Sequence, residues 1–343
     1  MPKIQPYIII PKLIPQPTWG GDYIASLKKL STTEKIGQSY ELYEESQLEN
    51  NSQPIPIREL IKQTIPLVKL TQAKGNSYQI HTPKKIPGVK WLPKPESWYY
   101  LEPGLISLGV KGNWDAYQKN CLAIDIKAKE LVASQPVSKA RQQLQQFIHT
   151  HNPIKFVNLV QVGRGQAIDL SAGGLHHSWE EDEQKYPQGN MVYEVQKNVY
   201  DDQSTIRCFD QGKITDDGKI RQLDIDDYFK YIDRSPQAND PKNHFRSGKI
   251  LKKSSLQTIK EIFTTPNYSL QLIKFRNQLA NKYTQTTDSF HHLFVSEGNL
   301  QLLWQKSTWT VTRGCSIVIP APCGTYELRT HKCYQATVLK TYV

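Results

Sequence analysis

The chain has 343 residues, of which 38% are hydrophobic and 22% are charged, and this composition excludes a largely disordered protein. The length is sufficient for two domains that each bury a core. The formal net charge of +11 comes from 43 lysines and arginines that are scattered along the chain, without the concentrated basic run that nucleic-acid binding favours. This surplus of positive charge is consistent with general solubility or with an anionic small-molecule substrate.

Hydropathy and cysteine content indicate the compartment. No apolar run approaches the roughly 20 residues that cross a bilayer, and prolines break the short apolar patch in the N-terminal MPKIQPYIIIPKL. The five cysteines are odd in number and include no CxxC pair, which argues against a disulfide framework and a cysteine-bound zinc site. We therefore expect a cytoplasmic monomer or weak dimer with no nucleic-acid or membrane partner.

The first third of the chain, after an extended N-terminal strand, is predicted to consist of strands and turns. Its short aromatic and β-branched runs are bounded by Gly, Pro or Asn: PLVKLTQAKG, NSYQIHTP, ESWYYLEPG and LISLGVKGN. The pattern then changes to helix. One helix is predicted over 114–134, and a second begins at Ser138 as its cap and carries an apolar face from Ala140 to Ile148.

Strands return in KFVNLVQVG, GQAIDLSAGG, MVYEVQKN and STIRCFDQG. A short helix around 226–232 leads to a polar stretch, which we take as a linker at 236–252. Beyond it, SLQTIKEIFTTP is predicted as a brief helix that Pro266 ends, and the rest of the chain is β. Both halves share a rhythm of short strands and Gly-containing turns, so we predict a mainly β fold of two jelly-roll domains, with a helical insertion at about 113–152 in the first.

The sharpest chemical signal is Gln79-Ile80-His81. Because a strand alternates faces, Gln79 and His81 point the same way. Glu96 follows 15 residues after His81, and the loop SAGGLHHSW presents an adjacent pair, His176 and His177, of which at most one can face a given site. An amide oxygen, two imidazoles and a carboxylate can hold one divalent metal and leave positions open, a mixed N/O set that suits zinc, with manganese or iron as alternatives. The acidic run at 180–183 is predicted as a solvated loop.

Eight segments, spread over nearly the whole chain, resemble in sequence and in order the type I mannose-6-phosphate isomerase (phosphomannose isomerase) family of the cupin superfamily. They are Trp19-Gly20-Gly21 with IGQSYE, then PLVKLTQAKGNSYQIHTP, KPESWYYLEPGLISLGVKG, VNLVQVGRGQAIDLSAGGLHHSW, YEVQKNVYDDQSTIRCFDQG, IFTTPNYSLQLIKF, FVSEGNLQL and RGCSIVIPAPCGTYEL.

The resemblance implies two cupin domains and a single metal site. Its metal ligands would be Gln79, His81, Glu96 and His176, the last because it directly follows the Gly-Gly-Leu turn. It further implies that mannose 6-phosphate and fructose 6-phosphate interconvert through an enediol(ate). Arg207 would hold the enediolate or help orient the sugar. Lys94, whose pKa the nearby metal would lower, and the metal-bound water are alternative candidates for proton handling.

The catalytic domain would span 1–235, and a structural C-terminal cupin 253–343, since His291, His292 and His331 have no Gln or Glu companion at strand spacing. Basic groups near the relevant segments could reach a substrate phosphate: Lys69, Lys84, Lys85 and Arg164. Two alternatives stay open, a non-catalytic cupin that binds a sugar phosphate and a metal-dependent cupin oxygenase.

Overall fold

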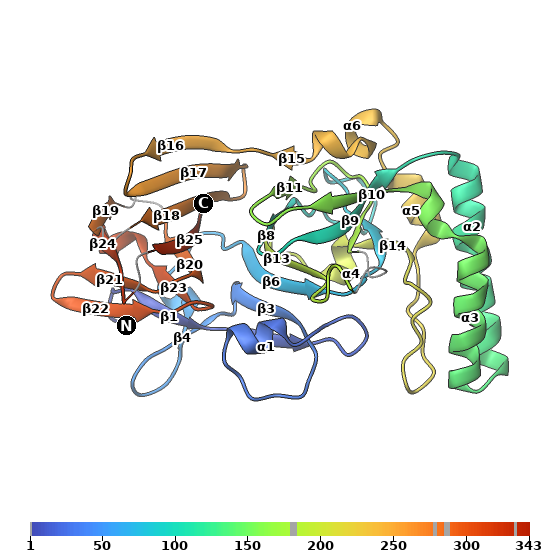
Figure 1. Cartoon of the computed structure of the whole chain (residues 1–343), viewed down its shortest axis with the longest axis horizontal. Coiled ribbons are helices and arrows are strands. Elements are labelled where there is room, and N and C mark those ends of the chain that lie inside the picture. Colours follow the sequence, from blue (N-terminus) through green and yellow to red (C-terminus); the bar gives the residue numbers. More distant parts are fainter. Residues whose placement is uncertain (1, 179–183, 277–279, 285–288, 333–334) are drawn as a thin grey trace.

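The structure is a computed structural model that describes residues 2–178, 184–276, 280–284, 289–332 and 335–343; the acidic run at 180–183 lies outside this range. The fold is mainly β, as predicted, with antiparallel sheets that form two double-sheet jelly rolls and with few helices (Figure 1).

The first jelly roll pairs a five-stranded with a seven-stranded sheet. The five-stranded sheet has the order β10 (Val157–Val162), β9 (Gly104–Val110), β12 (His176–Ser178), β7 (Tyr78–Ile80) and β14 (Ile206–Phe209). The seven-stranded sheet has the order β15 (Phe245–Arg246), β11 (Ala167–Asp169), β8 (Glu96–Tyr100), β13 (Asn190–Gln196), β6 (Leu67–Ala73), β3 (Ile36–Leu42) and β2 (Lys12–Pro15). Buried side chains from both sheets, among them Trp98 and Leu108, form the core between them.

The second jelly roll pairs a nine-stranded with a four-stranded sheet. The former has the order β16 (Lys249–Lys253), β17 (Gln257–Thr264), β18 (Ser269–Arg276), β25 (Gln335–Tyr342), β20 (His291–Glu297), β23 (Ser316–Ile319), β1 (Tyr7–Ile10), β4 (Gln47–Leu48) and β5 (Ile55–Pro56). The latter has the order β19 (Ala280–Thr284), β24 (Thr325–Thr330), β21 (Leu300–Trp304) and β22 (Ser307–Val311). The N-terminal strand β1 thus pairs with β23 of the C-terminal half. The domain limits 1–235 and 253–343 stay a prediction.

The outer face of the seven-stranded sheet packs against the nine-stranded sheet. Strand periodicity shows how: in β13, Tyr193 and Val195 join this interlayer core, whereas Val192 packs inside the first jelly roll. In β6, Val68 and Leu70 face the same interlayer core. Every side chain of β6 and β13 is therefore buried, whichever face it lies on.

The longer helices cover the opposite side of the first jelly roll (Figure 1). The insertion is a hairpin of α2 (Trp114–Ser134) and α3 (Val137–His151), and α5 (Ile225–Tyr231) lies beside it. Shorter elements are α1 (Tyr23–Leu27), α4 (Asp201–Ser204), α6 (Pro236–Asn239) and 3₁₀ turns at Ile57–Glu59, Pro153–Phe156, Pro241–Asn243 and Ala321–Cys323. The helical insertion is thus confirmed.

Two local predictions were wrong. The second insertion helix has Pro136 at its N-cap and no side-chain cap, so Ser138 lies inside the helix. The segment predicted as a brief helix before Pro266 is strand β17, which pairs with β16 and β18. Its β-branched residues and two neighbouring strands outweigh a weak helical pattern. Within the predicted linker, residues 245–246 and 249–253 are also strands.

No helix in the described part of the chain is both long and apolar enough to span a membrane.

The interlayer core yields a stability prediction. Leu70 is fully buried between the two large sheets, so Leu70→Ala should lower the free energy of unfolding by about 2–5 kcal/mol. Leu159→Ala, on β10 with 41% exposure, is the matched control and should change it by about 0.5 kcal/mol or less. Chemical denaturation measures both; equal effects would contradict the packing of the two sheets.

Candidate metal centre and active site

A polar cavity of about 300 Å³ opens into the first jelly roll. Strand alternation directs the side chains that line it. On β8, Glu96 and Trp98 face inward while Ser97 and Tyr99 face outward, where Ser97 Oγ lies 2.9 Å from Tyr268 Oη. On β7, Gln79 faces the cavity while Tyr78 and Ile80 pack toward the helices.

The structure brings the four predicted ligand residues together. His81, Glu96 and His176 are buried, and their ligand atoms all lie within 4.8 Å of one another. His81 Nε2 lies 3.1 Å and His176 Nε2 3.9 Å from the carboxylate of Glu96. Gln79 pairs with His176 in register and its amide Nε2 donates to His176 Nε2 at 3.0 Å. These four side chains are hereafter the inner cluster.

The position of His176 depends on the turn that precedes it. Gly173 has φ of +78°, a conformation that favours glycine. Gly174 passes so close to Ala238 that an added Cβ would lie 2.1 Å from its carbonyl oxygen. His176, two residues after Gly174, begins β12 with its side chain facing inward. The side chain of His177 faces the helices, with Nδ1 3.2 Å from Ser107 Oγ.

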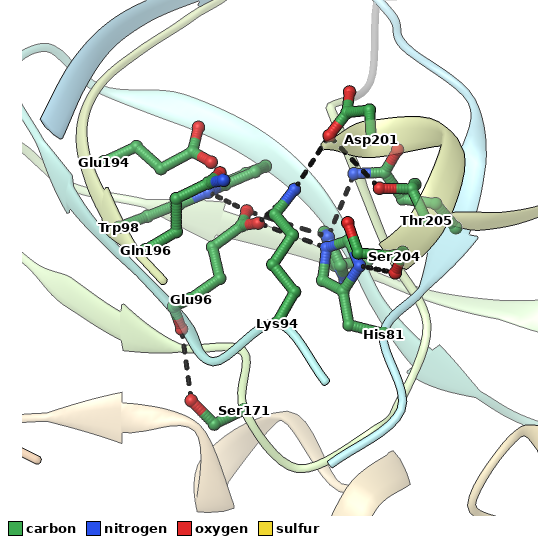
Figure 2. Close-up of polar contacts among 12 residues, drawn as sticks. His81, Lys94, Glu96, Trp98, Ser171, Glu194, Gln196, Asp201, Ser204 and Thr205 are labelled. Atoms are coloured by element: carbon green, nitrogen blue, oxygen red, sulfur yellow. Dashed lines mark hydrogen bonds and ion pairs between the residues drawn. The ribbon is translucent and has the colours of Figure 1, made fainter. Parts of the chain in front are cut away.

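A hydrogen bond fixes the tautomer of His81, and burial keeps both imidazoles neutral. His81 Nδ1 donates to the carbonyl of Ser204 at 2.9 Å, which leaves an unprotonated Nε2 facing Glu96 (Figure 2). Burial first, and then Lys94, lowers the pKa of His81. Burial, helped by His81, lowers the pKa of His176 to about 3. Both rings are therefore neutral near pH 7 and present lone pairs.

Glu96 carries the negative charge of the cluster. Burial raises its pKa, but Lys94 and then His81 outweigh this effect, so that the pKa lies well below its ordinary value. Trp98 Nε1 donates to Glu96 Oε1 at 2.6 Å, and Lys94 Nζ lies 3.0 Å from Oε2. The carboxylate is held on one side by an indole and on the other by an ammonium group.

Lys94 is 3% exposed and its ammonium lies between two carboxylates (Figure 2). Burial alone would lower its pKa. The carboxylates of Asp201, at 3.1 Å, and Glu96 raise the pKa by more than burial lowers it, so the net change is upward. The expectation of a lowered pKa assumed a bound metal beside the lysine and stays a prediction. Without that cation, the two carboxylates keep Lys94 protonated at neutral pH.

Arg207 reaches the cavity from β14, directly opposite Gln79. Its guanidinium donates to Ser77 Oγ at 3.0 Å and to the carbonyl of Thr205 at 3.2 Å. Asp201 Oδ2 lies 3.4 Å from Arg207 Nη2, so this single carboxylate on α4 contacts both Lys94 and Arg207. The pKa of Arg207 is lowered by burial, an effect that Asp201 opposes.

A second buried ion pair lines the same cavity. Lys69 Nζ is 3.1 Å from Glu194 Oε1, and Thr71 donates to Glu194 Oε2 at 2.9 Å. Burial, and then repulsion from Glu96, raises the pKa of Glu194 to about 7, outweighing the effect of Lys69. No sequence pattern singled out Glu194 or Asp201, since isolated acidic residues are common on any chain.

The inner cluster fits a divalent metal. Ligand atoms about 2.0–2.2 Å from one zinc ion lie roughly 3–4 Å from each other, as the Glu96 carboxylate does from His81 Nε2 and from His176 Nε2. His81 Nε2 is buried and has no hydrogen-bond partner among the described residues. Neutral imidazoles with a charged carboxylate are the donor set that zinc prefers. In the described part of the chain this is the one such group of His, Cys, Asp and Glu.

The predicted phosphate-binding residues separate in space. Lys69 lines the cavity, but Lys84 and Lys85 are exposed outside it, and Arg164 forms an ion pair with Glu297 of the second jelly roll. Arg221 lines the cavity instead, with Nε 3.0 Å from Asp210 Oδ2.

In the second jelly roll, the buried His291 and His292 have their Nδ1 atoms beside the hydroxyls of Tyr326 and Tyr193, respectively.

Comparison with solved structures shows that the whole chain adopts the fold of several mannose 6-phosphate isomerases. A mannose 6-phosphate isomerase from Bacillus subtilis superposes with a TM-score of 0.72 at 16% identity, covering 99% of this chain and 100% of that one. A zinc-bound mannose 6-phosphate isomerase gives 0.66 at 12% identity, with 97% and 98% covered. The apo form from Salmonella typhimurium gives 0.65 at 13% identity, with 98% and 99% covered.

No family model and no curated protein matches the sequence. At such low identity the likeness to solved structures shows the fold alone.

The state of His176 can be measured directly. In protein freed of metal by a chelator, its imidazole should stay neutral down to about pH 4, since its pKa is about 3 against about 6.5 in an unfolded chain. Between pH 6.5 and 3 the unfolded state then binds the extra proton, so this histidine lowers the free energy of unfolding as the pH falls. Imidazole ¹⁵N shifts report the titration, with denatured protein as the reference. A folded-state midpoint near 6.5 would contradict the buried site.

Proposed function

We propose that the protein is a metal-dependent aldose-ketose isomerase that interconverts mannose 6-phosphate and fructose 6-phosphate. The observation that carries the proposal is the inner cluster beside Arg207 and Lys94 in one cavity of the first jelly roll. The solved structures with the same fold are named as mannose 6-phosphate isomerases, which supports this substrate.

Gln79, His81, Glu96 and His176 would hold one Zn²⁺, the metal named for one of the similar structures. Gln79 would turn its amide oxygen inward by a flip of the amide, which replaces its donation to His176 Nε2 and is favourable when a cation is bound by both acceptor atoms. A bound divalent cation polarises substrate oxygens and stabilises the negative charge that develops on them.

The cavity charges suit an anionic sugar. Five carboxylates and four cationic side chains line it, so the addition of a dication changes the net charge from negative to positive. A phosphate monoester is then attracted into the cavity. Arg207 and Arg221 are the arginines that line it, and a planar guanidinium with several donors suits phosphate or enediolate oxygens.

The isomerisation moves a proton between C1 and C2 and a second proton between their oxygens. Arg207, fixed by Ser77 and Thr205, would stabilise the enediolate oxygens. Lys94, kept protonated by its two carboxylate neighbours, would donate to a substrate oxygen. Glu194, with a pKa of about 7, is the carboxylate in the cavity suited to accept and return a proton near neutral pH.

The two halves of the chain would divide the work. The cavity lies within the proposed catalytic domain at 1–235, and the C-terminal cupin at 253–343 would support it through the interlayer core. We also propose a cytoplasmic enzyme, in keeping with free cysteines such as Cys121 and Cys208 that are buried side chains.

Removing one ligand tests the metal assignment. His81→Ala should abolish bound metal and the formation of fructose 6-phosphate from mannose 6-phosphate. His177→Gln is the control, because this histidine faces away from the inner cluster, and it should keep both. Elemental analysis and a coupled assay give the two readouts. Bound metal without any turnover in the wild type would favour the non-catalytic sugar-phosphate binder.

Arg207 separates catalysis from metal binding. Arg207→Ala should leave the metal content unchanged while turnover falls by about 10²–10³-fold, because the guanidinium acts on charge in the transition state. Arg207→Lys keeps the positive charge but loses the planar guanidinium, so its turnover should lie between those of the wild type and Arg207→Ala. Steady-state kinetics with metal analysis measures this, and normal turnover in Arg207→Ala would refute the role.

A further inference from the structure

A second polar cavity, of about 270 Å³, lies where the two jelly rolls meet. Its floor is buried and includes Tyr99 of β8 and Phe294 and Thr337 of the second jelly roll. Its rim carries Arg164 from the turn before β11, and Lys274 and Arg313 from the second jelly roll. None of these residues lines the cavity of the inner cluster.

The rim has more positive than negative charge. Arg164 is paired with Glu297, whose other carboxylate oxygen accepts from Thr337 at 2.7 Å. The guanidinium of Arg313 contacts only neutral groups among the described residues, namely the Tyr23 hydroxyl and the Ser296 carbonyl, both at 3.3 Å. Lys274 is exposed and has no ion-pair or hydrogen-bond partner in the described part of the chain.

Negative charge nearby is limited. Besides Glu297, the near carboxylate is Glu102, which lies outside the lining and accepts from the Tyr23 hydroxyl at 2.8 Å. Three cationic side chains on the lining therefore face one carboxylate. Two of these cations, Arg313 and Lys274, remain without an anion.

Tyr99 supplies an independent observation. Its side chain is 5% exposed, yet its hydroxyl makes no hydrogen bond with any described residue and faces the cavity near Gly165. The hydroxyl is not among the fully buried polar atoms of the described residues that lack a partner, so its oxygen is open to the cavity and can donate to a ligand there. Burial raises the pKa of Tyr99 to about 12, so the hydroxyl is a donor at neutral pH.

We propose that this cavity is a second anion site, which binds a phosphate monoester of a small metabolite through Lys274, Arg313 and the Tyr99 hydroxyl. The volume holds more than a bare phosphate, and three donors from both jelly rolls would surround the phosphoryl oxygens. Tyr99 lies on β8, the strand that also carries Glu96, so the bound anion would contact the same strand as the inner cluster.

Calorimetric titration with glycerol 3-phosphate tests the proposal, in the Arg207→Ala background so that the proposed active site does not dominate the signal. Lys274→Met and Arg313→Met should each raise the Kd at least about tenfold. Tyr99→Phe, which removes one hydroxyl, should raise it about threefold to tenfold. The matched control is Arg276→Met, an exposed arginine of β18 outside the cavity, which should leave the Kd unchanged.

Two further measurements make each outcome decisive. Titration with inorganic phosphate should give weaker binding at the same residues, whereas equal or tighter binding would show that the site takes free phosphate rather than a monoester. Thermal unfolding checks each variant, and if Arg313→Met fails to fold, exposed Lys274→Met and Tyr99→Phe decide. No saturable binding, or a Kd that these two variants leave unchanged, would overturn the site whether or not the isomerase proposal holds.

Discussion

The structure depends on one buried charge, the carboxylate of Glu96 inside the first jelly roll. A carboxylate that is 1% exposed is costly unless ionic and hydrogen-bonding partners compensate for the lost water. Lys94, the Trp98 indole and two neutral imidazoles surround it here. The site is therefore a set of interdependent groups: removal of one partner leaves the others in an unfavourable environment.

The layered fold holds this set in place. Because side chains alternate along a strand, a slip of one residue in β6, β8 or β13 would exchange the polar side chains of the cavity with the apolar ones of the interlayer core. Packing of the nine-stranded sheet against Val68, Tyr193 and Val195 resists that slip. The second jelly roll thus fixes the register of the strands that carry Lys69, Glu96 and Glu194.

Much of this arrangement could be predicted from the sequence. The alternation in Gln79-Ile80-His81 and the Gly-Gly turn before His176 are local signals, and the structure places these side chains together with Glu96 as expected. The mainly β fold and the helical insertion follow from the spacing of turns and the change of period near Trp114.

Other features depend on contacts between distant segments, which no local pattern encodes. Asp201 reaches Lys94 across 107 residues and raises its pKa in the absence of a metal. The sequence of β17 has a weak helical pattern, but its pairing with two neighbouring strands makes it a strand. Pairing of β1 with β23 joins the two ends of the chain. Arg164, expected near the sugar phosphate, lies at the boundary of the jelly rolls.

The most direct test of the account is a crystal structure of the purified protein with anomalous data collected at the zinc edge. The account predicts one strong peak about 2.0–2.3 Å from His81 Nε2, His176 Nε2 and a Glu96 oxygen. A fully occupied metal elsewhere, or none at this position in protein that is active, would contradict it.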